Sequence, residues 1–136
     1  MRGRRKPNSY IQLTTSCGEI KGLRQEGCLV FEGVKYAEAG RWEDPQVIRG
    51  WEGVYDATRR GPHLQFHRRQ PAVFNDFYYN ENAEKQIYEY SEEDGLNLNI
   101  WAPEKGENLP VAVFVHGGSF VSGSNTSPNI FRGVDY

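Results

Sequence analysis

The chain has 136 residues, a formal net charge of −2 and 38% hydrophobic residues. This length allows at most one ordinary domain, and the near-zero net charge gives no reason to expect nucleic-acid binding. The basic cluster Arg2-Gly3-Arg4-Arg5-Lys6 is followed by polar residues and not by an apolar run. We therefore expect residues 1–9 to form a basic flexible tail, with neither a signal peptide nor a membrane span. The domain is expected over residues 10–136, in the cytoplasm.

A small antiparallel meander is predicted at the start of the chain. Residues 10–14 alternate between apolar and polar, and residues 18–23 and 28–34 follow, with Gln25-Glu26-Gly27 as a turn. Cys17 and Cys28 lie in this part of the chain. Two cysteines do not make a disulfide framework, and without an export signal both are expected to be free thiols.

The middle of the chain is less regular. Several glycines and Pro45 interrupt residues 37–53, and residues 54–58 form the next predicted strand. Trp42 and Trp51 are interpreted as packing anchors, because exposed tryptophans are uncommon.

Residues 63–94 read as a long, solvated loop rich in acidic side chains. His63 and His67 have the i,i+4 spacing that would suit a metal on a helix. However, Pro62 and Pro71 bracket them and no third ligand is evident. No metal site is therefore predicted.

The strongest pattern lies in the last third of the chain. Residues 96–101 alternate with period two, and the unbroken apolar run Val111–Val115 is typical of a strand buried on both faces. The polar loop between them has a length that fits a hairpin. We predict that this hairpin leads into the central sheet of an α/β fold.

The apolar run ends at His116-Gly117-Gly118-Ser119-Phe120. Gly117 permits a tight turn at the end of the strand. A glycine-rich loop in this place can direct successive N–H groups at one point, which suits a developing oxyanion. It corresponds to the HGGG-type oxyanion loop of lipases and esterases, with Ser119 in the third position. Taken alone, the loop also fits a strand that simply ends in a glycine turn.

These segments, taken together, resemble the N-terminal part of the type-B carboxylesterases, the cholinesterase-like branch of the α/β-hydrolases. Six ordered matches carry the resemblance: residues 18–22, residues 31–37, Arg41-Trp42 with Pro45, residues 51–58 with Gly61-Pro62, residues 91–103, and the glycine loop. The resemblance implies an α/β class. This chain would be the incomplete N-terminal portion of an α/β-hydrolase, mostly β in this segment.

Two departures from the family pattern concern single residues. Lys35 replaces the proline of the family's F-x-G-[IV]-P-Y-A segment. In the family, a cysteine shortly after G-P pairs with the cysteine of S-E-D-C-L. Here Gly95 stands at the second position and His63-Leu64-Gln65 offers no cysteine at the first.

The resemblance implies a serine esterase acting on small-molecule esters, without cofactor or metal. The backbone N–H groups of Gly118 and Ser119 would bind the oxyanion. Gly117 would allow the turn, and His116 would support the loop. Phe120 would line the substrate pocket or pack in the core.

The chain contains no G-x-S-x-G elbow, and the resemblance places the nucleophile, acid and base in none of its residues. We therefore expect the 136 residues alone to be inactive. The alternative is a non-catalytic, cholinesterase-like interaction module or a truncated, inactive fragment. An exposed sheet edge also leaves room for self-association.

Overall fold

The computed structural model describes residues 9–25, 27–64, 91–117 and 125. These residues form strands and loops, and no helix occurs among them. The strands are β1 (Ser9–Thr15), β2 (Gly18–Gln25), β3 (Cys28–Lys35), β4 (Ala37–Glu38), β5 (Gln46–Val47), β6 (Val54–Asp56) and β7 (Asn97–Pro103). The expectation that this segment is mostly β is confirmed.

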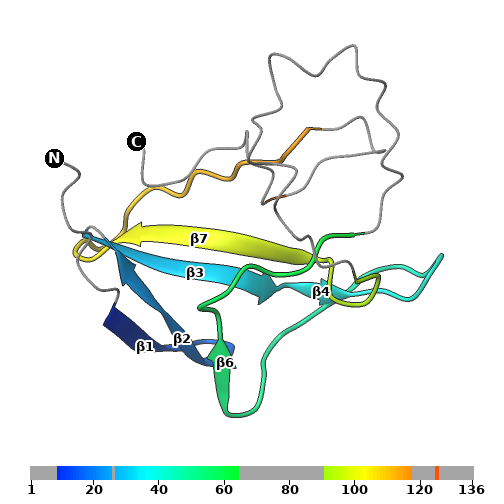
Figure 1. The fold of residues 1–136 in the computed structure, drawn as a ribbon, viewed down its shortest axis with the longest axis horizontal. Helices are drawn as coiled ribbons and strands as arrows, with labels where there is room; N and C mark the ends of the chain where they lie inside the picture. The colour runs from blue at the N-terminus through cyan, green and yellow to red at the C-terminus, as the bar shows by residue number, and fades with distance from the viewer. Residues whose placement is uncertain (1–8, 26, 65–90, 118–124, 126–136) are drawn as a thin grey trace, which may run out of the picture.

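The main sheet has the order β1-β2-β3-β7, and Figure 1 shows β3 and β7 as two long strands side by side. All neighbours in this order are antiparallel. β1 and β2 pair from Ser9↔Arg24 to Thr15↔Gly18, and β2 turns back into β3 at Gln25↔Cys28. The predicted meander is therefore confirmed.

β2 changes partners along its length. Its first half pairs in parallel with β6, from Glu19↔Val54 to Lys21↔Asp56, and its last residues pair with β3. β3 is bulged between Phe31 and Val34, where Gly33 has φ +67. The left-handed conformation and the close approach of the Gly61 N atom, 2.6 Å from where a Cβ would lie, require glycine at position 33.

A small core lies where β2, β3 and β6 meet. Its buried members are Ile20, Phe31, Val34 and Ala57. Trp51 packs against this cluster with its ring 4.9 Å from that of Tyr55, and its indole N–H donates to the Glu19 carbonyl at 2.6 Å. The prediction that Trp51 is a packing anchor is confirmed.

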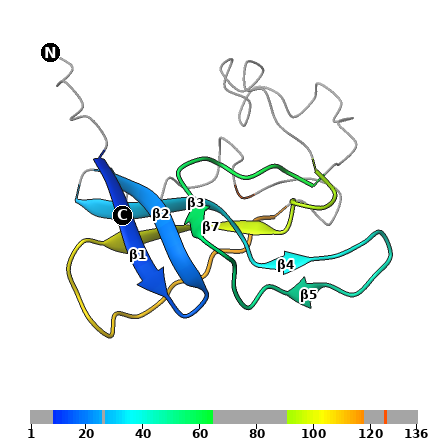
Figure 2. The same cartoon turned by 90° about the horizontal axis from the view of Figure 1, so that it is seen from below.

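The same prediction for Trp42 is wrong. Trp42 is 95% exposed, has φ +68, and lies in the loop between β4 and β5. These two short strands pair with each other in a sheet of their own. Figure 2 shows their hairpin extending away from the main sheet. Nothing in the described part of the chain packs over the Trp42 ring, because its hairpin extends beyond the sheet.

The predicted strand at Val111–Val115 does not form. These residues have no regular structure in the described chain, and Figure 1 draws them as a plain tube. Val111, Val113 and Val115 are 82–87% exposed. The predicted hairpin is also wrong, because β7 takes β3 as its partner. An apolar run can be buried on both faces only where neighbouring strands and two covering layers exist, and the described residues supply neither around it.

Candidate functional site

The glycine loop is described only at its start. His116 and Gly117 are exposed, and the His116 Nδ1 atom lies 2.9 Å from the Gly117 carbonyl oxygen. A Cβ on Gly117 would meet no atom within 4 Å. The predicted oxyanion donors Gly118 and Ser119, and the predicted pocket residue Phe120, lie outside the described residues, so their roles stay predictions.

Beyond the loop, Asn125 is joined to β7 by three hydrogen bonds. Its side-chain amide donates to the Asn97 carbonyl oxygen at 3.0 Å and to Asn97 Oδ1 at 2.9 Å. Its own carbonyl oxygen accepts from Asn99 Nδ2 at 3.2 Å. The chain is thus fixed to β7 eight positions beyond Gly117.

Asn97 and Asn99 also organise the loops around β7. Asn99 Oδ1 accepts the Gly33 N–H at 2.9 Å, which satisfies the bulge in β3. Asn97 is buried and donates to the carbonyl oxygens of Pro62 and Asp94 at 2.8 and 2.9 Å. Its amide occupies the space next to Gly61, where any Cβ would come within 2.5 Å of it.

Sequence reasoning missed these asparagines as organising residues. The available signal was their period-two spacing, which puts Asn97 and Asn99 on one face of the strand. Leu98 and Ile100 are 37% and 40% exposed and the asparagines face inward, which is the reverse of the usual apolar-inward alternation.

The two ends of the predicted long loop meet at a narrow neck. The Ser91 N–H donates to the His63 carbonyl oxygen at 2.9 Å, across 28 positions of sequence. Next to this bond, a Cβ on Gly95 would lie 2.6 Å from Leu64 Cγ. The family resemblance implies a disulfide between the position of Gly95 and one near residues 63–65, and here the Leu64 side chain packs on Gly95 instead. Residues 65–90, including His67, lie outside the described residues.

His63 is buried in this neck, with 6% of its surface exposed. Burial lowers the pKa of His63, and the positive charges of Arg60 and His116 lower this pKa further.

No group of three or more His, Cys, Asp or Glu that could hold a metal exists among the residues the structure describes. Cys17 and Cys28 are both free and partly exposed.

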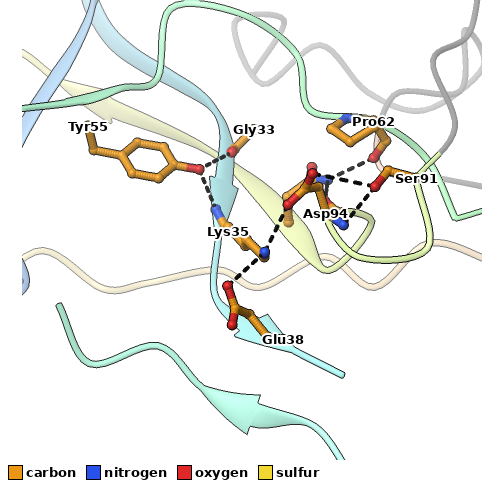
Figure 3. A network of polar contacts seen from close by, with 8 residues as sticks. Gly33, Lys35, Glu38, Tyr55, Pro62, Ser91 and Asp94 are labelled. Carbon is orange, nitrogen blue, oxygen red and sulfur yellow. Dashed lines mark hydrogen bonds and ion pairs between the residues drawn. The ribbon is translucent and has the colours of Figure 1, made fainter. Parts of the chain in front are cut away.

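Lys35 links the end of β3 to the neck, as Figure 3 shows. Its ammonium contacts Glu38 Oε1 at 2.9 Å and Asp94 Oδ1 at 2.8 Å. The hydrogen bonds to Asp94 and Glu38 raise the pKa of Lys35, and the hydrogen bond from Lys35 lowers the pKa of Asp94. Because Lys35 is not a proline, its backbone N–H also donates to Tyr55 Oη at 3.0 Å, while the Tyr55 hydroxyl donates to the Gly33 carbonyl at 2.8 Å.

Arg41 forms a second ion pair with the same region. Its guanidinium contacts both carboxylate oxygens of Glu92, one of them through Nε at 3.2 Å. The pKa of Glu92 is lowered by this hydrogen bond and by the charge of Arg41. Two ion pairs therefore hold this region: Lys35 at the end of β3 binds Asp94, and Arg41 in the β4–β5 hairpin binds Glu92.

Comparison with known proteins identifies the family of this chain. Residues 9–133 match the carboxylesterase family. The chain is 34% identical over 120 residues to phenmedipham hydrolase of Pseudarthrobacter oxydans, a match that covers 85% of this chain and 23% of that protein. It is 34% identical over 121 residues to para-nitrobenzyl esterase of Bacillus subtilis (strain 168), with the same two shares.

Solved structures that resemble this chain are also esterases. A thermophilic para-nitrobenzyl esterase matches with a TM-score of 0.64 and 34% identity, covering 86% of this chain and 23% of that one. A carboxylesterase of Geobacillus stearothermophilus matches with a TM-score of 0.63 and 33% identity, covering 86% and 22%. No helix able to cross a membrane is found in the part of the chain that the structure describes.

This chain spans less than a quarter of the length of those relatives. The matches confirm the α/β-hydrolase fold class and the resemblance to the N-terminal portion of the type-B esterases. The chain belongs to the carboxylesterase family.

Proposed function

We propose that this chain is the N-terminal segment of a serine carboxylesterase that hydrolyses small-molecule carboxylic esters, and that its chemical contribution is the oxyanion loop. One observation carries the proposal. The family match runs through residue 133 and so includes the whole of His116-Gly117-Gly118-Ser119-Phe120. The esterases and lipases among the relatives support the reaction class.

In this reaction, an activated serine attacks the ester carbonyl, and the carbonyl oxygen becomes negatively charged. The N–H groups of Gly118 and Ser119, with that of the residue after the serine, would hold this charge. The loss of one such donor costs about 10²–10³ in turnover. His116 would support the loop, and Phe120 would line the side of the pocket that accepts the substrate.

The serine, its acid and its base would come from sequence outside these 136 residues, because the chain has no G-x-S-x-G elbow. The chain alone should therefore hydrolyse no activated short-chain ester above background. A nucleophile, a base and an oxyanion hole are all needed, and the chain supplies part of the third.

We also place the protein in a reducing compartment. The free thiols of Cys17 and Cys28 are compatible with this, and so is the contact of Leu64 with Gly95, which stands at one position of the family disulfide. Neither feature requires an oxidising environment for folding.

A graft tests the function directly. Residues 9–133 would replace the matching segment of Bacillus subtilis para-nitrobenzyl esterase, and turnover of a p-nitrophenyl ester would be followed. We expect a hydrolytic graft, a Gly118→Ala variant that keeps substantial activity, and a Gly118→Pro variant whose kcat falls by about 10²–10³, because proline removes the N–H donor.

Two results would count against the proposal. If Gly118→Pro and Gly118→Ala were equally active, the loop would not supply the donor. If the isolated 136-residue chain hydrolysed the ester and Gly118→Pro abolished this activity, a nucleophile would exist within it, and Ser119 and Ser122 would be the first residues to substitute.

A further inference from the structure

Asn125, which follows the glycine loop in the sequence, is held by amide groups that no active-site motif includes. Asn125 uses both its side chain and its carbonyl oxygen to bind β7. Its partners Asn97 and Asn99 lie two positions apart on the inward face of that strand. Each partner also binds a second part of the fold, through Pro62 and Asp94 or through Gly33.

We propose that Asn97, Asn99 and Asn125 form an amide latch that positions the oxyanion loop, with Asn97 and Asn99 as positioning residues. The latch sets where the chain continues after the loop, and so restricts the directions in which the loop's N–H groups can point. This inference rests on the proposed function, since it assigns a purpose to the orientation of that loop.

The composition of the loop explains why such a latch is needed. Gly117, Gly118 and Gly123 lie in or just after it, and glycine has little conformational preference of its own. Oxyanion donors contribute most when their direction is set before the reaction. Functional groups on glycine-rich sequences are held in place by hydrogen bonds from the residues around them.

The chemistry of the latch also argues for a specific role. Asn97 is buried, and burying an amide is unfavourable unless its hydrogen bonds are made. Its side chain and carbonyl oxygen make two bonds to loop residues 62 and 94 and two to Asn125, so this amide is well satisfied. An apolar residue would fill the site without joining three separate segments.

Isosteric Asn→Asp substitutions distinguish the hydrogen bonds of the latch from those of the rest of the fold. Asn99→Asp keeps the Oδ1 acceptor for the Gly33 N–H and loses the donor to the Asn125 carbonyl. Asn125→Asp loses both donors to Asn97 and keeps the Asn125 carbonyl. Asn108→Asp makes the same chemical change at an exposed position outside the latch and serves as the matched control.

The experiment is ¹⁵N-resolved NMR and amide hydrogen exchange on the 136-residue chain. In both latch variants we expect the Gly117 and Gly118 amide signals to shift. In Asn99→Asp, which keeps the Asn125 side-chain amide, we expect this amide to exchange at least about tenfold faster. The Gly33 N–H should stay protected, and the β1–β2 signals should stay in place. Asn108→Asp should leave all of these signals unchanged.

Unchanged Gly117 and Gly118 signals in both latch variants would overturn the proposal, and so would equal shifts in Asn108→Asp. If a buried carboxylate unfolds the chain, the uncharged Asn125→Ala variant decides by the same signals. These readouts need no ester hydrolysis. The NMR signals test the latch and the turnover of the graft tests the esterase assignment, so the failure of one proposal can be distinguished from the failure of the other.

Discussion

At the scale of single residues, Lys35 shows how this chain replaces a family feature. A proline there would have no N–H for the Tyr55 hydroxyl and no charge for Asp94. Lysine supplies both the N–H and the charge, so the end of β3 is held by a hydrogen bond to the Tyr55 hydroxyl and by an ion pair with Asp94. The partners Glu38 and Asp94 are largely exposed, so each ion pair contributes about 0–1 kcal/mol.

His63 leads to a prediction about pH. Because its pKa is lowered by burial and by the charges of Arg60 and His116, the unfolded chain takes up the proton first, near pH 6.5. The contribution to stability is therefore complete above pH 6.5 and is lost as the pH falls through the folded-state pKa. We expect a slope of up to about 1.4 kcal/mol per pH unit below pH 6.5.

Urea denaturation at pH 7.5, 6.5 and 5.5 measures this slope. In His63→Gln the slope between pH 6.5 and 5.5 should largely disappear. In the control His116→Gln it should decrease only slightly, because the charge of His116 is the smallest of the three causes. An unchanged slope in His63→Gln would contradict the assignment.

At the scale of elements, the neck between Leu64 and Gly95 can be made covalent. A Cβ on residue 95 would lie 2.6 Å from Leu64 Cγ, which is close to where the sulfur of a cysteine at position 64 would lie. Leu64→Cys combined with Gly95→Cys should therefore form a disulfide in air. Closing a loop of this length should stabilise the chain by about 3.7 kcal/mol, less any strain from the close Ser91 carbonyl.

Thiol titration of the denatured, non-reduced protein provides the test. The double variant should show two reactive thiols, from Cys17 and Cys28, and its thermal midpoint should fall on reduction. The single variant Gly95→Cys should show three thiols and no such fall. Four thiols in the double variant would mean that the two positions do not approach as the structure has them.

At the scale of the whole molecule, the most unusual feature is the apolar surface of the last third of the described chain. Val111, Val113 and Val115 are 82–87% exposed, and Leu98 and Ile100 are outward-facing on β7. Exposed apolar segments favour association with other chains. We therefore expect the isolated chain to self-associate through residues 111–115.

Sedimentation velocity over a range of concentrations tests this expectation. Val113→Lys should shift the distribution toward the monomer, because a charge at the centre of the segment opposes its burial. Val47→Lys, on the exposed β5 strand, makes the same change outside the segment and should leave the distribution unchanged. Equal effects of the two variants would show that charge alone, and not the segment, controls association.

Elements that depend on near neighbours could be predicted from the amino-acid sequence. Period-two alternation and turn residues predicted β1, β2 and β3, and ordered motifs from residue 18 onward indicated the carboxylesterase family. These features are local, so no distant partner is needed to read them. Features that depend on strand pairing and burial could be seen only in the folded chain. β7 pairs with β3 and not with Val111–Val115, the side chains of Asn97 and Asn99 face inward, and Leu64 packs on Gly95. Each of these features depends on residues far away in the sequence.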